Sequence, residues 1–292
     1  MKVGVPKEIK NHEYRVGLVP ASVRELAQRG HDVYIQSTAG QGIGVDDREY
    51  EAAGASILPD AESVFAAAEM IVKVKEPQAV ERALLREHHT LFTYLHLAPD
   101  APQTEGLIAS GATCIAYETV TDDHGHLPLL APMSEVAGRL SIQAGAWCLE
   151  KARGGSGVLL GGVPGVQPAK VVIIGGGVVG FNACQMAVGM GARVVVLDRS
   201  LEVLRFLDTT FSSSISTVFS NVESIERHIR DADLVVGAVL IPGAAAPKLV
   251  TRDDLTIRRN GSVLVDVAID QGGCFETSRP TTHGDPTYIV EG

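Results

Sequence analysis

Three glycines follow a short apolar run in the second half of the chain, with the spacing of a phosphate-binding turn. Residues 171–174 are Val-Val-Ile-Ile, and Gly175, Gly177 and Gly180 complete the pattern G-x-G-x-x-G. In such a turn the first glycine permits a tight bend, the second lets the backbone approach a pyrophosphate, and the third allows close helix packing. Free N–H groups at the start of the following helix suit phosphate oxygens. The pattern predicts a dinucleotide site; a glycine turn that binds nothing is the alternative.

An acidic residue ends the next apolar run, at residues 193–198. Asp198 in this place suits the 2′-hydroxyl of an NAD ribose and repels the extra phosphate of NADP. Arg199 beside it weakens this exclusion without reversing it. The sequence therefore favours NAD as the cofactor.

Charged side chains also follow other apolar runs. Arg15 lies in the loop after the first run, Lys75 and His96 close two later ones, and Asp270 ends the run that starts at Val263. Ligands of open α/β sheets bind beyond the carboxyl ends of the strands. Two cations, an imidazole and a carboxylate beside a nicotinamide would form a coherent site for an amino acid.

Each of these residues also has a simpler interpretation. A lone arginine is commonly a solvated loop charge, and a histidine at a strand end is commonly structural. Lys73 and Lys75 alternate with valines, which is also typical of lysines that guard a sheet edge. Asp270 is equally placed to cap the turn at residues 271–273, and Asp266 competes with it as the acid of the site.

Short apolar runs alternate with helical patterns along the whole chain, which is typical of parallel sheets with crossover helices. The predicted fold class is α/β, with two Rossmann-like, doubly wound domains, mainly parallel sheets and an interdomain cleft. Residues 121–132 break the alternation, so we expect a substrate domain at 1–128 and an NAD-binding domain at 129–292. The expected strands lie at residues 2–5, 31–37, 70–75, 90–97, 113–120, 171–174, 193–197, 217–219, 234–239 and 262–267.

A long amphipathic helix is expected to begin the second domain. Ser134 is a plausible N-cap for it, and four apolar residues recur at helical spacing: Val136, Leu140, Ala144 and Trp147.

Composition excludes several classes of protein. Hydrophobic residues make up 45% and charged residues 21%, which is typical of a globular protein. A formal charge of −10 without a basic cluster argues against nucleic acid or an anionic membrane as a partner. The four cysteines are scattered without a C-x-x-C pair, so we expect neither a disulfide framework nor a metal site. Since the N-terminus lacks the apolar run of a signal peptide, a soluble cytoplasmic protein is expected.

Several segments of the sequence resemble the bacterial alanine dehydrogenase family, and the resemblance runs through essentially the whole chain. It is carried by VGVPKE at residues 3–8, EYRV at 13–16, VKVKEP at 72–77, FTYLHL at 92–97, LAPMSEVAGR at 130–139 and, most specifically, VAIDQGGCFE at 267–276. The resemblance implies a reversible, NAD-dependent oxidative deamination of L-alanine to pyruvate and ammonia. It also implies homohexamers, built through surfaces partly on the helix that starts near Ser134.

The resemblance implies a role for each site residue. Arg15 and Lys75 would hold the substrate carboxylate and carbonyl, His96 would be the acid–base group, and Asp270 would position the attacking water. The residues that would contact NAD, or lie close to it, are Ser134, Asp198, Ser220, Val239, Leu240, Val267, Ala268, Ile269, Asp270 and Arg279.

The chain departs from the family pattern in two respects. Val203 stands where the family tends to carry a basic residue, which removes one expected adenosine contact. Family members also continue beyond the point that corresponds to Gly292, with a segment that completes the nicotinamide pocket. We therefore expect a C-terminally shortened chain, for which a catalytically impaired NAD-binding fragment is one alternative. A related transhydrogenase, or a lysine- or saccharopine-type dehydrogenase, is the other.

Overall fold

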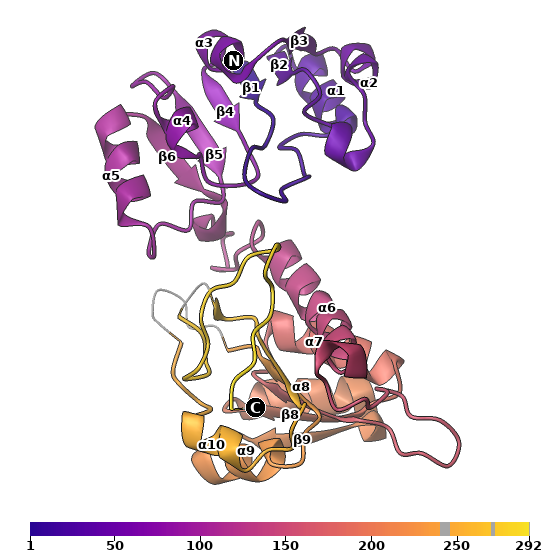
Figure 1. Cartoon of the computed structure of the whole chain (residues 1–292). Coiled ribbons are helices and arrows are strands. Elements are labelled where there is room, and N and C mark those ends of the chain that lie inside the picture. Colours follow the sequence, from indigo (N-terminus) through magenta and orange to yellow (C-terminus); the bar gives the residue numbers. More distant parts are fainter. Residues whose placement is uncertain (240–245, 270–271, 292) are drawn as a thin grey trace. The chain divides into compact units, whose positions relative to one another are not determined.

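The computed structural model describes residues 1–239, 246–269 and 272–291. The chain divides into two compact units, Met1–Leu130 (unit 1) and Ala131–Gly292 (unit 2), coloured indigo to magenta and magenta to yellow in Figure 1. Leu240 and Asp270 of the expected site lie outside the described residues. Within those residues no helix is both long enough and apolar enough to cross a membrane.

Unit 1 is built on a parallel sheet of six strands in the order β3-β2-β1-β4-β5-β6. The strands are β1 Lys2–Val5, β2 Asp32–Gln36, β3 Ser56–Leu58, β4 Met70–Val72, β5 Thr90–Thr93 and β6 Thr113–Ala116. The helices are α1 Pro20–Gln28, α2 Asp47–Ala52, α3 Ala61–Ala67, α4 Ala79–Arg82 and α5 Ala101–Ser110, with 3₁₀ turns η1 Gln41–Ile43 and η2 Tyr117–Thr119. The strand order reverses between β1 and β4, and ligands of such sheets bind beyond the carboxyl ends of the strands at this point.

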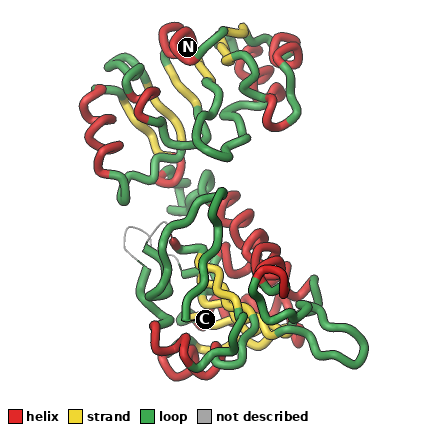
Figure 2. Tube along the Cα trace, in the orientation of Figure 1, coloured by secondary structure: helices red, strands yellow, loops and turns green. Residues whose placement is uncertain are grey.

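Unit 2 contains a parallel sheet of five strands in the order β11-β10-β7-β8-β9. The strands are β7 Lys170–Ile174, β8 Arg193–Asp198, β9 Ile215–Phe219, β10 Leu234–Gly237 and β11 Val263–Asp266. The helices are α6 Ala131–Cys148, α7 Val178–Gly189, α8 Leu201–Phe211, α9 Val222–Ile229 and α10 Arg252–Thr256, with 3₁₀ turns η3 Lys151–Arg153 and η4 Ser212–Ser214. After β11 the described chain continues as the loops drawn in green in Figure 2. The predicted α/β class with two parallel, Rossmann-like sheets is confirmed.

The core of unit 2 follows from the alternation of side chains along a strand. Val171 and Ile173 of β7 pack on one face of the sheet in a cluster with Ile142 of α6. Val172 of β7 faces the other way and packs in a cluster with Ile225 of α9. All of β7 is buried because helices cover both faces, which explains why its sequence is continuously apolar.

Strands β4, β5 and β6 of unit 1 all end several residues earlier than predicted, β6 at Ala116, and carboxylates are the reason for the first two. Residues 70–75 and 90–97 read as continuous strands, yet β4 ends at Val72 and β5 at Thr93. Beyond these points Glu8 accepts the N–H of Val74 at 2.7 Å. Glu118 in the same way accepts the N–H of His96 at 2.6 Å. Strands β4 and β5 therefore stop where a side chain takes the amides that a neighbouring strand would use.

The prediction for the long helix was wrong in two respects. Helix α6 begins at Ala131, so Ser134 lies inside it and is not its N-cap. The apolar stripe of the sequence faces outward, with Val136, Leu140 and Trp147 exposed by 54%, 50% and 40%. The buried side carries Ile142 and three small residues instead. Helices α6 and α7 pack closely there, since a Cβ atom on Gly138 would lie 2.3 Å from the carbonyl oxygen of Val179.

Candidate active site and dinucleotide site

The glycine turn has the geometry that a pyrophosphate needs. Gly175 follows β7 with a φ of 103°, in the left-handed region that glycine tolerates. A Cβ atom on Gly180 would lie 1.8 Å from the carbonyl oxygen of Gly175, so only glycine fits there. Gly177 ends the turn as the N-cap of α7, and a Cβ atom there would meet no atom within 4 Å. The space beside the backbone of Gly177 is open, which fits a bound phosphate group.

Asp198 ends β8 and is held against this turn. One carboxylate oxygen accepts the N–H of Gly176 at 2.6 Å, and the other accepts the N–H of Ser200 at 2.7 Å. Each oxygen keeps lone pairs that suit a ribose hydroxyl, so the residues present fit NAD. Val203 packs on the same turn, since a Cβ atom on Gly176 would lie 2.7 Å from its Cγ1. An apolar side chain therefore occupies the place where a basic residue was expected.

Other residues expected to contact NAD lie at the same edge of this sheet. Ser220 follows β9 and donates its N–H to the carbonyl of Asp198, and Val239 follows β10. Residues 267–269 follow β11, whereas Ser134 lies in the first turns of α6. Arg279 stacks its guanidinium over the ring of Tyr288, 4.3 Å from the centroid.

Asp266 was expected to compete with Asp270 as the acid of the site, but its carboxylate forms hydrogen bonds within the protein. Its carboxylate accepts the N–H groups of Ala268 and Phe275, both at 3.1 Å, and the hydroxyl of Ser278 at 2.5 Å. These bonds fold the segment after β11 back on itself. Asp266 therefore organises the turn that carries the expected NAD contacts. The competing residue, Asp270, lies outside the described residues.

Arg15 lies in the loop after β1 and is paired with Glu13. Its Nε donates to one oxygen of Glu13 at 2.8 Å and its Nη2 to the other at 2.5 Å. Burial pushes the pKa of Glu13 upward, but the hydrogen bonds from Arg15 prevail and lower it below its ordinary value. The same bonds raise the pKa of Arg15. This fork-to-fork pairing fixes the orientation of the guanidinium plane.

Lys73 is the centre of a buried ion triad and has no part in guarding an edge. Its Nζ lies 3.0 Å from Glu8 and 2.7 Å from Glu81, and the three side chains are 0%, 2% and 3% exposed. The strand β4 that precedes it lies in the interior of the sheet. The edge-guard interpretation is thus wrong. Glu8 joins the triad to the site, because its second oxygen accepts the N–H groups of Val74 and Lys75.

Lys75 lies near two cations, Lys10 and Arg15, and near the carboxylate of Glu76. Its side chain is 26% exposed, and its Nζ lies 3.9 Å from Glu76. Burial lowers the pKa of Lys75; Glu76 opposes this effect, while Lys10 and Arg15 reinforce it. The carbonyl of Lys75 accepts the hydroxyl of Thr93 in β5, which ties the segments after β4 and β5 together.

His96 follows β5 in an unusual backbone conformation, with a φ of 50°. Its ring stacks on that of Tyr94 at 6.1 Å between centroids. Burial raises the pKa of Tyr94, and the nearby Arg15 guanidinium opposes that rise. Arg15, Lys75 and His96 thus follow β1, β4 and β5, three neighbouring parallel strands. Arg15 lies near both Lys75 and Tyr94, and the ring of Tyr94 stacks on that of His96.

Sequence reasoning missed the carboxylates that support this site. Glu8, Glu13 and Glu118 were not expected to act, although each forms hydrogen bonds to a site residue or to its backbone. Glu81 was missed as well, and it completes the buried triad through Lys73. The available signal was an acidic residue inside or beside an apolar run, as for Glu118 in residues 113–120. Among the described residues, no group of three or more His, Cys, Asp or Glu side chains could hold a metal ion.

Fold and site together define an NAD-dependent oxidoreductase with two parallel-sheet units, one of which carries the dinucleotide turn. Two family models match the chain: "Alanine dehydrogenase/PNT, N-terminal domain" at residues 4–137 and "Alanine dehydrogenase/PNT, C-terminal domain" at residues 141–292. The chain belongs to the alanine dehydrogenase family, as the resemblance predicted.

Individual relatives agree with this assignment. An alanine dehydrogenase of Halomonas elongata is 61% identical over 292 residues, which are 100% of this chain and 79% of that protein. One of Mycolicibacterium smegmatis is 56% identical over 99% of this chain and 78% of its own length. A solved L-alanine dehydrogenase superimposes with a TM-score of 0.94 at 54% identity, covering 99% of this chain and 80% of its own. The transhydrogenase of Sinorhizobium meliloti gives 0.82 at 27% identity, over 96% and 82%.

Proposed function

We propose that this chain catalyses the reversible, NAD-dependent oxidative deamination of L-alanine to pyruvate and ammonia. Residues 1–128 would form the substrate domain and residues 129–292 the NAD-binding domain. The observation that carries the proposal is the cluster of Arg15, Lys75 and His96 beyond the carboxyl ends of three adjacent strands. Membership of the alanine dehydrogenase family supports the choice of substrate.

Arg15 is proposed to bind the substrate carboxylate. A guanidinium offers planar pairs of N–H donors that match the two oxygens of a carboxylate. Glu13 holds one edge of this plane, so the side chain enters the reaction already oriented. Preorganisation of this kind reduces the entropy lost when the substrate binds.

Lys75 and His96 are proposed to act at the carbon that reacts. The Lys75 ammonium, a compact point charge, would bind the carbonyl oxygen of pyruvate. His96 would move protons to and from the substrate, since histidine is the side chain that titrates most readily near neutral pH. Asp270, outside the described residues, is proposed from the family resemblance to position the attacking water. NAD supplies the hydride acceptor when it is bound on the Gly175–Gly180 turn.

Substrate profiling tests the proposal against its alternatives. We expect alanine-dependent NADH formation that exceeds any rate with L-lysine or saccharopine, and a preference for NAD over NADP. A faster reaction with lysine would support the lysine-type alternative, and NAD binding without turnover would support the impaired fragment. An Arg15→Lys variant should raise the KM for alanine by roughly 10-fold or more, because lysine lacks the planar fork. Arg24→Lys, on the exposed side of α1, is the matched control and should change nothing.

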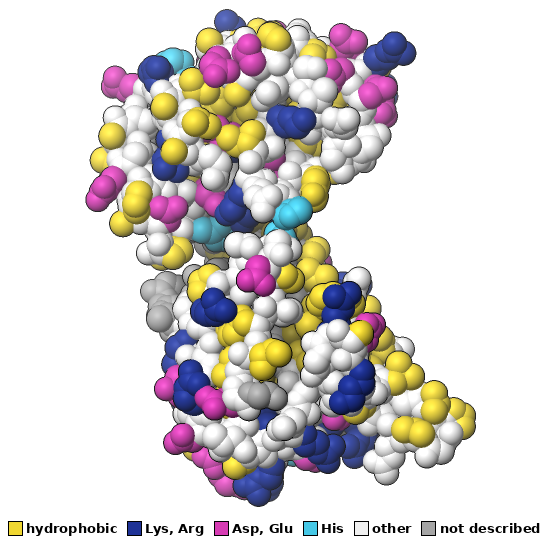
Figure 3. Space-filling view, viewed as in Figure 1, with side chains coloured by type: hydrophobic (Ala, Val, Ile, Leu, Met, Phe, Trp, Pro, Cys, Tyr) yellow, Lys and Arg dark blue, Asp and Glu magenta, His cyan; other side chains and the backbone are white. Residues whose placement is uncertain are grey.

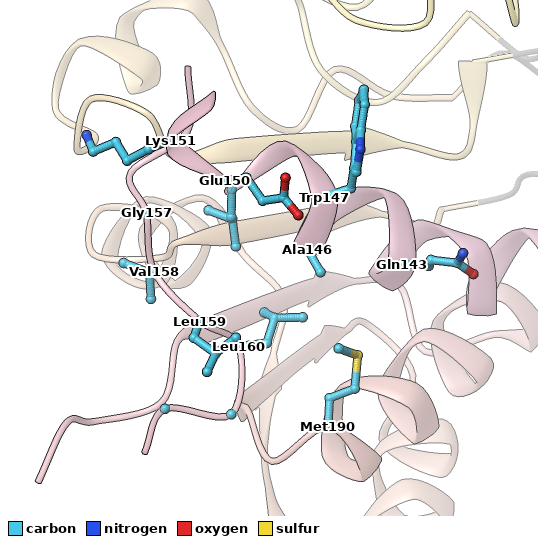
Figure 4. Close-up of a pocket in the computed structure, with 13 residues that line it drawn as sticks. Gln143, Ala146, Trp147, Glu150, Lys151, Gly157, Val158, Leu159, Leu160 and Met190 are labelled. Atoms are coloured by element: carbon cyan, nitrogen blue, oxygen red, sulfur yellow. The ribbon is translucent and has the colours of Figure 1, made fainter. Parts of the chain in front are cut away.

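We further propose that copies of this chain associate through the exposed apolar side of α6, as hexamers by family resemblance. On the face shown in Figure 3, hydrophobic side chains also gather on the loop that projects before β7, where Leu159, Val163 and Val166 are exposed. A pocket of about 900 Å³ lies beside this loop and is lined in part by Trp147 and Met190 (Figure 4). Monomeric proteins rarely expose contiguous apolar surface of this kind.

Light scattering after size exclusion tests this association. A Leu140→Asp variant should lower the molar mass of the assembly, whereas Ile108→Asp on α5, a residue that is 76% exposed, should not. A wild-type monomer would contradict the proposal.

We also propose a cytoplasmic location, which the four free thiols support.

A further inference from the structure

The backbone leaves the sheet immediately before His96. The N–H of Tyr94 still reaches the carbonyl of Val74 at 3.4 Å. The next two amides turn to Glu118: that of Leu95 lies 3.0 and 3.2 Å from the two carboxylate oxygens, and that of His96 lies 2.6 Å from Oε1. Leu95 is only 1% exposed, so its amide requires a partner inside the protein. A single carboxylate therefore captures two consecutive N–H groups.

The backbone conformation of His96 that Glu118 stabilises is strained. With a φ of 50°, His96 lies in the left-handed region, which residues with a Cβ atom adopt rarely and at a cost. Such a conformation persists only where the surroundings fix it, and N–H bonds to a carboxylate are stronger than those to a neutral acceptor. The direction of the Cα–Cβ bond follows from φ and ψ, so a backbone held by Glu118 sets the direction in which the side chain of His96 leaves the chain.

Glu118 is itself held firmly in place. It lies in η2, directly after β6, whose residue Ala116 pairs in register with Thr93 of β5. The ring of the preceding residue, Tyr117, packs edge-on against Phe92 at 4.3 Å and Tyr94 at 4.9 Å. The carboxylate is thereby fixed on the strand that neighbours β5, opposite the turn that it supports.

We propose that Glu118 is a positioning residue for His96, acting through the backbone and not on the substrate. The inference rests on the proposed acid–base role of His96. It assigns Glu118 the task of imposing the left-handed backbone that aims the imidazole.

Four single variants and one double variant test the inference in the alanine-dependent reaction. Glu118→Ala should lower kcat by about 10²-fold, the typical effect of misplacing a catalytic group by 1 Å, with little change in the affinity for NADH. Glu118→Gln keeps a carbonyl oxygen that accepts both amides, so its kcat should stay within about 10-fold of wild type. Glu105→Gln on the exposed side of α5 is the control and should leave kcat unchanged. A Gln variant as slow as the Ala variant would assign the carboxylate a chemical role and overturn the inference.

The double variant separates this inference from the proposed function. If Glu118 acts through His96, Glu118→Ala should have no further effect on kcat in a His96→Ala background, since residues that act as a unit are non-additive. Equal fold-losses in both backgrounds would overturn the inference while leaving the role of His96 intact. A His96→Ala variant with wild-type turnover would instead contradict the proposed function.

Amide hydrogen exchange gives a measurement that does not depend on activity. In the wild-type chain the peptide covering residues 94–97 should be protected, and Glu118→Ala should accelerate its exchange by at least 10-fold. Glu118→Gln should largely preserve the protection. Unchanged exchange in the Ala variant would overturn the inference whatever the kinetics show.

Discussion

A Lys73→Met substitution isolates the buried ion triad of unit 1, because methionine keeps the length of the side chain and removes its charge. The ammonium lies 3.0 Å from Glu8 and 2.7 Å from Glu81, and none of the three side chains is more than 3% exposed. Removing one partner of a buried pair leaves an uncompensated charge, which costs about 3–5 kcal/mol. A loss of this size is a large part of the ~5–15 kcal/mol that stabilises a typical domain.

Thermal and urea denaturation measure this loss. We expect Lys73→Met to lower the Tm of unit 1 by roughly 10–20 °C. The control is Lys10→Met, which removes a partly exposed partner of Glu76 and should cost at most about 1 kcal/mol. A triple variant with Glu8→Gln and Glu81→Gln added removes every charge of the triad, so it should recover part of the lost stability.

The deficit of Lys73→Met should also depend on pH. Burial already raises the pKa of Glu8, and Lys73 is the main group that opposes this rise. In the variant the folded-state pKa of Glu8 rises further above its unfolded value, so the folded state binds more protons between the two values. Its stability therefore falls as the pH rises through that window, and the deficit should be smaller at pH 5 than at pH 8. A deficit below 1 kcal/mol, or one independent of pH, would refute the reasoning.

Two further predictions concern unit 2. Gly138→Ala should destabilise the protein by about 1–3 kcal/mol in urea denaturation, because the added Cβ would lie 2.3 Å from a carbonyl oxygen of α7. Its control, Gly189→Ala at the end of α7, meets no atom within 4 Å and should stabilise by up to ~1 kcal/mol; similar effects of both would contradict the packing described for α6. Asp198→Ala should weaken NAD binding about 10–100-fold in calorimetric titration and reduce discrimination against NADP, whereas the exposed Asp208→Ala should do neither. Unchanged NAD affinity in Asp198→Ala would remove this carboxylate from the cofactor site.

The parts of the molecule that local sequence determines were predictable. The glycine turn follows its strand and begins α7 as expected, because Gly175 and Gly180 answer local steric demands that no other residue meets. Apart from β3, which was not expected, the parallel strands were visible as apolar runs because strands buried on both faces carry apolar side chains on both. Asp198 ends its strand next to this turn, where its carboxylate binds the N–H of Gly176.

The carboxylates that support the substrate site were not predictable, because their partners are distant in sequence. Glu8 binds amides 66 and 67 residues away, and Glu118 binds amides 22 and 23 residues away. Periodicity extended β4 and β5 by several residues, since it records which side chains are apolar and not which amides a carboxylate captures.

The wrong prediction for the buried side of α6 has a different cause. A pattern of large apolar residues ordinarily marks the buried side of a helix. Close packing selects glycine on the buried side, Gly138 against α7 and Gly145 against Leu234 of β10, and glycines contribute little to such a pattern. The large residues Leu140 and Trp147 are exposed, and nothing in the sequence indicated that they would face outward.

The proposed function depends above all on the role of His96, held beyond the carboxyl end of β5, as the acid–base group of alanine oxidation. Its most direct test is alanine-dependent NADH formation by the wild-type chain and by His96→Ala, with NADH affinity measured in parallel and the exposed His124→Ala as control. We expect a loss of about 10²–10⁴-fold in turnover for His96→Ala alone, with NADH binding retained. Turnover of His96→Ala within a few-fold of wild type would contradict it.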